Sequence, residues 1–333
     1  MRLKNKTIIV TGGAGFIGSH LVDRLISSNN KVIIIDDFST GKHENIEHNK
    51  ASGQLSVEKA DVRDLDTMIR LTKEADIVFH LAVACLRTSL NEPISVHEIN
   101  TTATLNMCQA SLKNNVKRFI YISSSEAYGS AKYVPMDENH PLNPTTVYGA
   151  SKAAGEFYTL AYWRTHGLPT MVVRPFNTYG PREPSEGYRA EVIPKFVLRA
   201  MAGLQPVVFG SGLQTRDFTW VEDTARGIAM AAECDELVGD YINIACGREV
   251  SIEKICQLVL KTIGDGNLKP KYMEEGRPGD VERHSANINK AQRLLGYSTE
   301  VDIEHGIEKY FQWIQTQNIN LASWVEQERI RNW

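Results

Sequence analysis

Tyr148 and Lys152 form the pair of side chains in this sequence best suited to proton transfer. They stand four residues apart, so in a helix both side chains lie on one face. A tyrosinate can accept a proton from a hydroxyl group, and a nearby ammonium would lower the pKa of the phenol. About one such pair is expected by chance in a chain of this composition, so the pair alone proves little. The alternative is a buried aromatic side chain beside a solvated lysine.

A serine-rich segment, Ser123–Glu126, adds weight to this pair. It directly follows the apolar run Arg118–Ile122, which predicts a buried strand. In open α/β sheets, ligands and catalytic groups collect at the carboxyl ends of strands. We therefore expect the Ser124 hydroxyl to share the hydrogen bond to the reacting oxygen.

A glycine-rich turn, Thr11–Gly18, follows the first apolar run and opens a helical pattern. Gly12 allows a tight turn, Gly15 lets backbone N–H groups approach a pyrophosphate, and Gly18 lets helix and strand pack closely. The helix N-terminus then offers N–H donors and partial positive charge to an anion. This strand–turn–helix context predicts a dinucleotide site; the alternative is a glycine-rich turn without a ligand.

Acidic residues end the second and third predicted strands. Asp36 and Asp37 lie about 20 residues past the glycines, where a carboxylate bonds the adenosine ribose hydroxyls and repels a 2′-phosphate. This favours NAD over NADP as cofactor, although Lys42 is near. The alternative is that Asp36 only caps the following loop. Asp61 and Val62 could hold the adenine edge.

Short β-rich runs alternate with helical patterns through the first half of the chain. Such alternation predicts parallel strands joined by right-handed crossovers, with helices on both faces. The predicted strands are Ile8–Val10, Val32–Ile35, Leu55–Val57, Ile77–Leu81, Arg118–Ile122 and Thr170–Val173. The predicted helices are Phe16–Ile26, Asp64–Thr72, Val96–Asn114, Tyr148–His166, Val192–Met201, 218–232 and 251–263.

The fold class is therefore α/β, a Rossmann-type doubly wound parallel sheet with a smaller, loop-rich C-terminal substrate domain. We expect a cofactor domain at 1–175, to which the chain returns around 213–245, and a substrate domain at 176–333, where prolines and glycines increase. The tail 318–333 is expected to pack on the body as a last helix; the alternative is a contact between subunits.

Composition excludes several other classes of protein. With 37 basic and 40 acidic residues, the net charge of −3 argues against a nucleic-acid binder. No apolar run is long enough for a membrane span or a signal segment. Five scattered cysteines, without C-x-x-C spacing, disfavour disulfides and a zinc site. We expect a cytoplasmic protein without a metal.

The chain resembles the extended short-chain dehydrogenase/reductases of the NAD-dependent sugar-nucleotide epimerase/dehydratase family. The resemblance runs from Thr11 to about Gly296. It is carried by T-G-G-A-G-F-I-G-S-H at 11–20, D-D at 36–37, D-V at 61–62, H-L-A at 80–82, S-S-S-E-A-Y-G at 123–129, Y-G-A-S-K at 148–152, R-P-F-N-T-Y-G-P-R at 174–182, Q-T-R-D-F at 214–218 and R-P-G-D at 277–280. Many pieces in the same order make the family specific, whereas the substrate is less so.

The resemblance implies a role for each of these segments. Tyr148 is the base, and Lys152 tunes it and holds the nicotinamide ribose. The NAD site implied is Gly12, Gly15, Phe16, Ile17, Gly18, Asp36, Asp37, Asp61, Val62, Leu81, Ala82, Tyr148 and Lys152. A UDP-sugar, the expected small-molecule partner, would meet Asn177, Arg216 and Arg277 at its diphosphate, Val192 and Phe209 at its base, and Asp280 at its ribose. For both arginines the alternative is surface ion pairing. A homodimer is expected.

Members of this family share oxidation at sugar C4 and then diverge. Glu126 stands where dehydratases and decarboxylases carry glutamate, although Ser125 replaces the aspartate that usual 4,6-dehydratases have before it. Cys85 could assist Glu126 as a proton donor, as in similar 5,6-dehydratases, or be a packed thiol. Arg87 could bind a uronic carboxylate. We therefore favour dehydratase-type chemistry at C5/C6. A 4-epimerase is the runner-up, and a uronate decarboxylase or a non-catalytic NAD-binding regulator ranks lower.

Overall fold

A seven-stranded parallel sheet forms the centre of the computed structural model, which describes residues 1–264, 267–276 and 280–331. The strand order is β11-β6-β5-β4-β1-β2-β3, so the chain builds outward from β1 first to one side and then to the other. This doubly wound order confirms the predicted α/β fold class. The strands are β1 (Thr7–Thr11), β2 (Lys31–Asp36), β3 (Leu55–Lys59), β4 (Ile77–His80), β5 (Arg118–Ile122), β6 (Thr170–Pro175) and β11 (Tyr241–Ile244).

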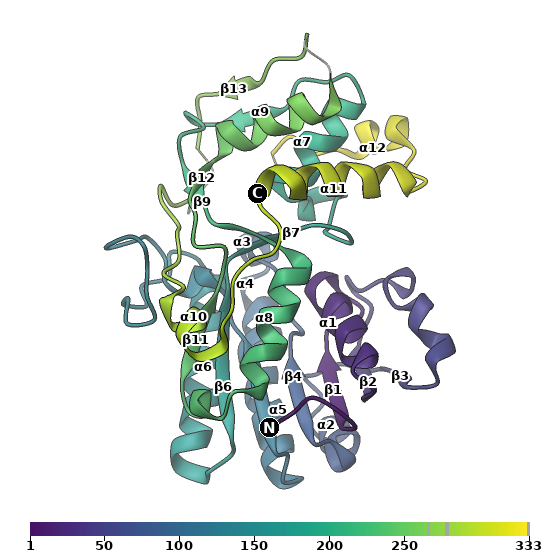
Figure 1. Ribbon diagram of the computed structural model, residues 1–333, viewed down its shortest axis with the longest axis vertical. Helices are drawn as coiled ribbons and strands as arrows, with labels where there is room; N and C mark the ends of the chain where they lie inside the picture. Colours follow the sequence, from purple (N-terminus) through teal and green to yellow (C-terminus); the bar gives the residue numbers. More distant parts are fainter. Residues whose placement is uncertain (265–266, 277–279, 332–333) are drawn as a thin grey trace.

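Helices cover both faces of this sheet (Figure 1). Because side chains alternate along a strand, Ile8 and Val10 of β1 pack with α1 and α8, whereas Ile9 packs with α2, α5 and α6. The helices of this part are α1 (Phe16–Ser27), α2 (Leu65–Leu71), α3 (Leu86–Asn91), α4 (Pro93–His97), α5 (Ala103–Lys113), α6 (Val147–His166), α8 (Val221–Glu233) and α10 (Asn289–Leu295).

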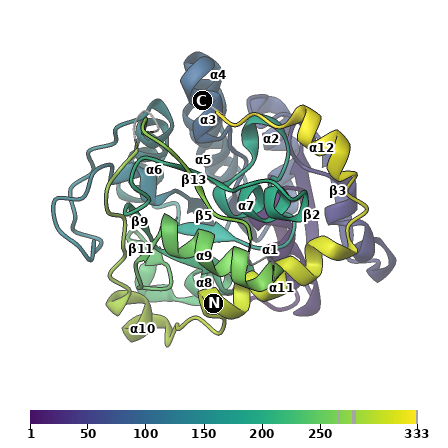
Figure 2. The same cartoon turned by 90° about the horizontal axis from the view of Figure 1, so that it is seen from above.

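A smaller lobe lies beyond one end of the sheet and has a hydrophobic cluster of its own (Figure 1). In Figure 2, which looks down on the lobe, its helices α9, α11 and α12 lie in front of the strands. The lobe contains α7 (Val192–Met201), α9 (Ile252–Ile263), α11 (Ile303–Thr316) and α12 (Leu321–Gln327). Short strand pairs complete it and join it to the sheet: β7 (Asn177–Tyr179) with β10 (Phe218–Trp220), β8 (Val207–Phe209) with β13 (Lys271–Met273), and β9 (Thr215–Arg216) with β12 (Val250–Ser251).

Two predicted helices have different limits in the structure. Residues 218–220 form β10, because they pair with β7, and the helix begins only at Val221. The predicted helix Val96–Asn114 is interrupted by a wider π-helical turn, Glu98–Thr102, between α4 and α5. The tail contains α12, and its Trp324 is buried in the lobe, which confirms the expected packing on the body. Within the described residues, no helix is both long and apolar enough to cross a membrane.

Candidate active site

A pocket of about 660 Å³ lies between the carboxyl ends of the sheet strands and the smaller lobe. Every predicted site residue that the structure describes lines this one pocket; Arg277 lies outside the described residues. Segments far apart in sequence meet here, including the glycine turn, the N-terminal half of α6 and the loop that leads into α7. A single cavity therefore joins the predicted cofactor residues to the predicted substrate residues.

The glycine turn leaves space for a ligand and no space for side chains. Gly12 has a φ of +67°, and a Cβ on Gly18 would lie 2.1 Å from the carbonyl oxygen of Gly12. The cap residue Gly15 offers no side chain to the first N–H groups of α1, and no acidic residue lies in the first turn of that helix. Backbone donors at a helix N-terminus fit a pyrophosphate, so the residues present fit a dinucleotide.

Asp36 caps the loop that follows β2 and also lines the pocket, so the two alternatives from the sequence are compatible with each other. Its carboxylate accepts hydrogen bonds from the N–H groups of Ala14, at 3.0 Å, and Phe38, at 2.9 Å, so it does cap the loop. It also lines the pocket at the end of β2. Burial raises the pKa of Asp36, and the two backbone donors oppose that rise.

The helix α6 carries both Tyr148 and Lys152 into the pocket. Thr146 caps this helix by accepting from the N–H of Gly149 at 3.0 Å, so Tyr148 stands in the first turn and Lys152 one turn later. The Lys152 ammonium donates to the carbonyl oxygen of Ile122 at 2.6 Å. It also lies 4.4 Å from the centre of the Tyr121 ring. The bond from Lys152 to Ile122 joins helix α6 to the end of β5, two residues before Ser124.

The sequence analysis predicted that Lys152 lowers the pKa of Tyr148, whereas in the structure burial has the largest effect on this pKa. Burial raises the pKa of Tyr148 well above its ordinary value, and a hydrogen bond with Ser124 opposes this. Burial also lowers the pKa of Lys152 to about 7, so its charge is weakened near neutrality. The sequence placed the two groups on one helix face but could not show that both are buried.

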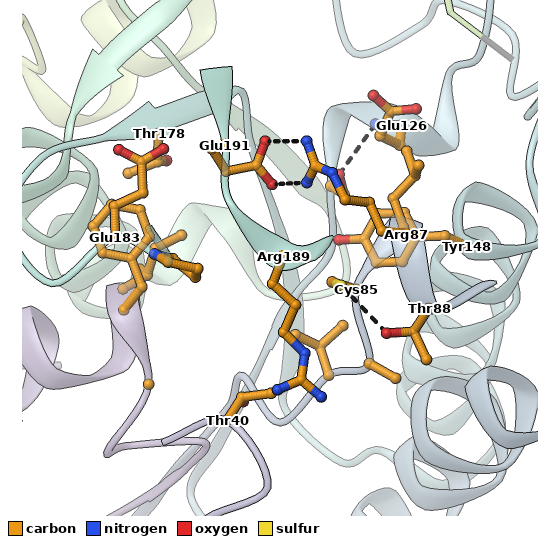
Figure 3. A pocket seen from close by; sticks show the side chains of 18 of the residues that line it. Thr40, Cys85, Arg87, Thr88, Glu126, Tyr148, Thr178, Glu183, Arg189 and Glu191 are labelled. Atoms are coloured by element: carbon orange, nitrogen blue, oxygen red, sulfur yellow. Dashed lines mark hydrogen bonds and ion pairs between the residues drawn. The ribbon is translucent and has the colours of Figure 1, made fainter. Parts of the chain in front are cut away.

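Glu126 and Cys85 lie near Tyr148, as Figure 3 shows. Both add to the rise in the pKa of Tyr148 through their charge, and so does Glu191. The Glu126 N–H donates to the Ser124 hydroxyl at 3.2 Å. The Cys85 thiol lies 3.4 Å from the Thr88 hydroxyl. An acid and a thiol are therefore available close to the tyrosine.

The arginines of the pocket have protein partners. Arg87, expected to be available to a uronic carboxylate, forms a two-bond ion pair with Glu191. Arg216 pairs with Asp280, so the two residues expected at the diphosphate and the ribose are joined to each other. Ion pairing, the alternative for Arg216, is thus present, but the side chain is buried in the pocket and not on the surface.

The sequence analysis missed three acidic residues that line the pocket: Glu92, Glu183 and Glu191. Glu191 is the cap residue of α7, immediately before Val192. An acid before an amphipathic helix was the one available signal, and an acidic residue at a helix N-terminus is also favoured by the helix dipole without any other role. Glu183 has a carboxylate that accepts from the N–H of Gly180 at 3.2 Å. Among the described residues, no group of three or more acidic, histidine or cysteine side chains could hold a metal ion.

This combination of glycine turn, tyrosine, lysine and serine defines a dinucleotide-dependent enzyme of the short-chain dehydrogenase/reductase type. The chain belongs to the family whose model is described as GDP-mannose 4,6 dehydratase, which matches residues 9–310. The predicted family is thereby confirmed, and with it the prediction that the protein is an enzyme.

Relatives in this family catalyse different reactions. A UDP-N-acetylglucosamine 4-epimerase from Methanobrevibacter ruminantium, solved with UDP-N-acetylmuramic acid, is 35% identical, with a TM-score of 0.88 over 94% of this chain and 99% of that one. A UDP-N-acetyl-alpha-D-glucosaminuronate decarboxylase from Bacillus cytotoxicus is 32% identical over 93% of this chain and 98% of its own. A dTDP-glucose 4,6-dehydratase from Streptomyces venezuelae, solved with NAD, is 28% identical, with a TM-score of 0.89 over 97% and 100%.

The prediction of NAD as cofactor is confirmed at the level of the family, which is NAD-dependent. The comparisons do not separate epimerization, dehydration and decarboxylation. The choice among them depends on the side chains at the sugar end of the pocket.

Proposed function

We propose that the protein is an NAD-dependent enzyme that oxidises C4 of a UDP-sugar to a 4-keto intermediate and later returns the hydride. The observation that carries this proposal is that Tyr148, Ser124 and Lys152 line the same pocket as the glycine turn. Relatives solved with UDP-glucose and with UDP-N-acetylmuramic acid support the choice of a UDP-sugar.

Proton transfer in this proposal belongs to Tyr148. The phenolate takes the proton of the C4 hydroxyl, and Ser124 holds the same oxygen by a hydrogen bond. Bound NAD would supply the acceptor for the C4 hydride and the donor that returns it. Lys152 would bind the nicotinamide ribose, and the positive charge of the nicotinamide would oppose the rise that burial causes in the pKa of Tyr148.

The nucleotide end of the substrate would meet the lobe. Asn177 has a buried side-chain oxygen that meets no hydrogen-bond donor among the described residues, so a ligand can use this side chain. Arg216 would turn to the diphosphate and Asp280 to the ribose, exchanging their bond to each other for bonds to the substrate. Val192 and Phe209 would enclose the base. From the sequence, Arg277 is expected to be a second diphosphate contact.

Dehydratase-type chemistry at C5/C6 is our first choice for the step after oxidation. The 4-keto group acidifies the C5 proton, and Glu126 lies near Tyr148, where it can take or return that proton. Cys85 could protonate the leaving group.

A 4-epimerase is the second candidate, because 4-epimerases of UDP-sugars match over more than nine-tenths of the chain. An epimerase needs no group to exchange the C5 proton.

The domain division and the oligomer are proposed on separate grounds. Residues 1–175, together with α8 and β11, where the chain returns to the sheet, would bind NAD, and residues 176–333 would bind the nucleotide.

A homodimer would cover the outer face of α6, where the side chain of Phe157 is 63% exposed and that of Trp163 is 37% exposed.

The test is incubation with UDP-glucose, UDP-N-acetylglucosamine and UDP-glucuronate in D2O, with products read by NMR and mass spectrometry. Dehydratase-type chemistry gives deuterium at C5 or C6, or a product lighter by water, and Glu126→Gln stops that step while reduced cofactor still forms. An epimerase gives a C4-inverted product of unchanged mass without deuterium on carbon, and it tolerates Glu126→Gln. Glu186→Gln, an exposed change outside the pocket, is the matched control. No reaction with any UDP-sugar would refute the proposal.

A further inference from the structure

The ion pair between Arg87 and Glu191 joins the two halves of the pocket at its sugar end (Figure 3). Arg87 belongs to α3, which follows the end of β4, whereas Glu191 precedes α7 of the lobe. Both terminal nitrogens of the guanidinium bond the two carboxylate oxygens, one of them at 2.9 Å. The Arg87 side chain is only 6% exposed, whereas that of Glu191 is 43% exposed. Bidentate pairing of this kind fixes the plane of the guanidinium as well as its position.

This pair lies close to the reacting group. Arg87, Glu191 and Tyr148 line the same pocket, and the pKa of Tyr148 is raised mainly by burial and to a smaller extent by acidic neighbours that include Glu191. The tyrosine hydroxyl marks the position of sugar C4 in the proposed reaction. C6 is two bonds from C4, so the proposed binding mode would place its substituent in the same part of the pocket, toward the Arg87–Glu191 pair or toward Glu126.

The surroundings of Arg87 are already acidic. Glu183 is buried in the same wall of the pocket, and burial together with the charge of Glu191 raises its pKa well above the ordinary value. Because a raised pKa favours the protonated, uncharged form of Glu183, Glu191 supplies the negative charge that faces Arg87. In the part of this wall that the structure describes, the buried cation Arg87 is matched by Glu191, so a carboxylate that approaches Arg87 would need to displace Glu191.

The other cationic side chains that line the described part of the pocket are also engaged. Their partners are protein carbonyl oxygens or carboxylates: Lys152 with Ile122, Arg189 with Ser39, Lys195 with Arg329 and Ile330, Arg199 with Glu328, and Arg216 with Asp280. Of these residues, Arg216 is the one that the proposed function assigns to the diphosphate. A second anionic group on the sugar would therefore compete with existing bonds.

We propose that the Arg87–Glu191 pair determines substrate specificity, by selecting a UDP-sugar with an uncharged C6 group and rejecting a UDP-uronate. This inference rests on the proposed function. The pair offers its remaining hydrogen-bonding capacity to hydroxyl or amide groups, which carry no net charge. A hexose or an N-acetylhexosamine meets this requirement, whereas a glucuronate at the same position brings a carboxylate against the carboxylate of Glu191. The decarboxylase alternative is thereby disfavoured on a physical ground.

The test compares binding of UDP-glucose and UDP-glucuronate, which differ only at C6, and of UDP alone. Binding is measured by calorimetry on the NAD-loaded protein in a Tyr148→Phe background, so that no turnover occurs. We expect UDP-glucuronate to bind at least ~10-fold more weakly than UDP-glucose. Glu191→Gln leaves Arg87 charged without its carboxylate partner, and we expect it to improve the relative affinity for UDP-glucuronate by at least ~10-fold.

Two further variants complete the experiment. Arg87→Gln removes the cation and should not improve binding of UDP-glucuronate, and Glu186→Gln on the same loop should leave the ratio unchanged. The specificity proposal would be overturned if the parent bound both UDP-sugars equally or preferred UDP-glucuronate. It would also be overturned if Glu191→Gln left the ratio of the two affinities unchanged. The proposed function would survive these results as long as UDP binds. If UDP and both UDP-sugars fail to bind, the proposed function fails, and this inference fails with it.

Discussion

Two arginine–glutamate pairs of the same chemistry lie in different parts of this molecule. Arg174 of β6 and Glu156 of α6 are both 2% exposed, and Glu156 also accepts from the Ser123 hydroxyl. Arg174 donates to the Tyr128 hydroxyl at 2.8 Å as well. The pair thereby holds both ends of the short segment that contains Ser124 and Glu126. In the Arg87–Glu191 pair, by contrast, the glutamate is 43% exposed at the pocket wall.

The difference in burial separates a structural role from a role in recognition. A fully buried pair cannot lose one partner without leaving an uncompensated charge in the interior. In the second pair the Glu191 carboxylate is 43% exposed, so water or a ligand can solvate this group when its bond to Arg87 is broken. The first pair therefore fixes the catalytic segment, and the second can change with the substrate at small cost to folding.

The largest expected effect is on folding, from breaking the buried pair. Arg174→Met leaves the Glu156 carboxylate without its partner, and we expect a loss of about 3–5 kcal/mol in the free energy of unfolding. Urea denaturation measures this loss. A loss below about 1 kcal/mol would show that Glu156 is solvated or protonated at little cost, and the comparison would fail.

The next effect falls on catalysis alone. Tyr148→Phe removes the base while leaving the packing of α6 intact, and we expect turnover to fall by at least ~10²-fold. UDP and NAD should bind as before, as calorimetry can check. Tyr158→Phe, an exposed change on the same helix, should turn over normally. Near-normal turnover by Tyr148→Phe would remove this tyrosine from the mechanism.

A smaller effect concerns the pH dependence of stability. Burial lowers the pKa of Lys152 from 10.5 in the unfolded chain to about 7 in the folded protein. The unfolded state therefore binds more protons between these values, so stability increases with pH there and is lost as pH falls toward 7. Lys152→Met should remove a slope of at most about 1.4 kcal/mol per pH unit.

Unfolding curves between pH 7 and pH 10 provide the measurement for this prediction. Lys113→Met, on the exposed side of α5, serves as the control and should keep the wild-type slope. Parallel profiles for the wild type and Lys152→Met would show that the lysine stays charged in the folded protein.

The smallest effect is expected at the second pair. Glu191→Gln should lower the free energy of unfolding by about 1 kcal/mol, because the removed carboxylate is 43% exposed and the glutamine oxygen can still accept a hydrogen bond from the buried Arg87 guanidinium. The same urea denaturation applies. A loss as large as that of Arg174→Met would mean that the two pairs have the same role, and the specificity proposal would lose its basis.

Local sequence signals predicted the parts of the protein that backbone geometry determines. The turn Gly12–Gly18, the sheet strands and the helix with Tyr148 and Lys152 could all be found, because glycine spacing, apolar runs and helical periodicity act within about 20 residues. The limits of the helix expected at 218 were wrong, because pairing of Phe218 with Asn177 of β7 overrode the local pattern.

Side-chain partners at the sugar end could not be predicted in the same way. Arg87 and Glu191 are 104 residues apart, and nothing near either residue indicates the other. The pKa of Tyr148 depends on burial, which the spacing to Lys152 does not report. Relatives with the same fold have names that denote different reactions, so the fold does not by itself indicate which reaction a member catalyses.

The central claim is that hydride leaves C4 of a UDP-sugar while Tyr148 takes the hydroxyl proton. Its most direct test is the rate of a single turnover with excess NAD-loaded enzyme, followed by absorbance of reduced cofactor and by product formation. The sugar is supplied unlabelled, with deuterium at C4, or with deuterium at C3 as the control. We predict that deuterium at C4 slows the reaction and that deuterium at C3 does not. Equal rates for all three sugars, or slowing by the C3 label alone, would contradict the account.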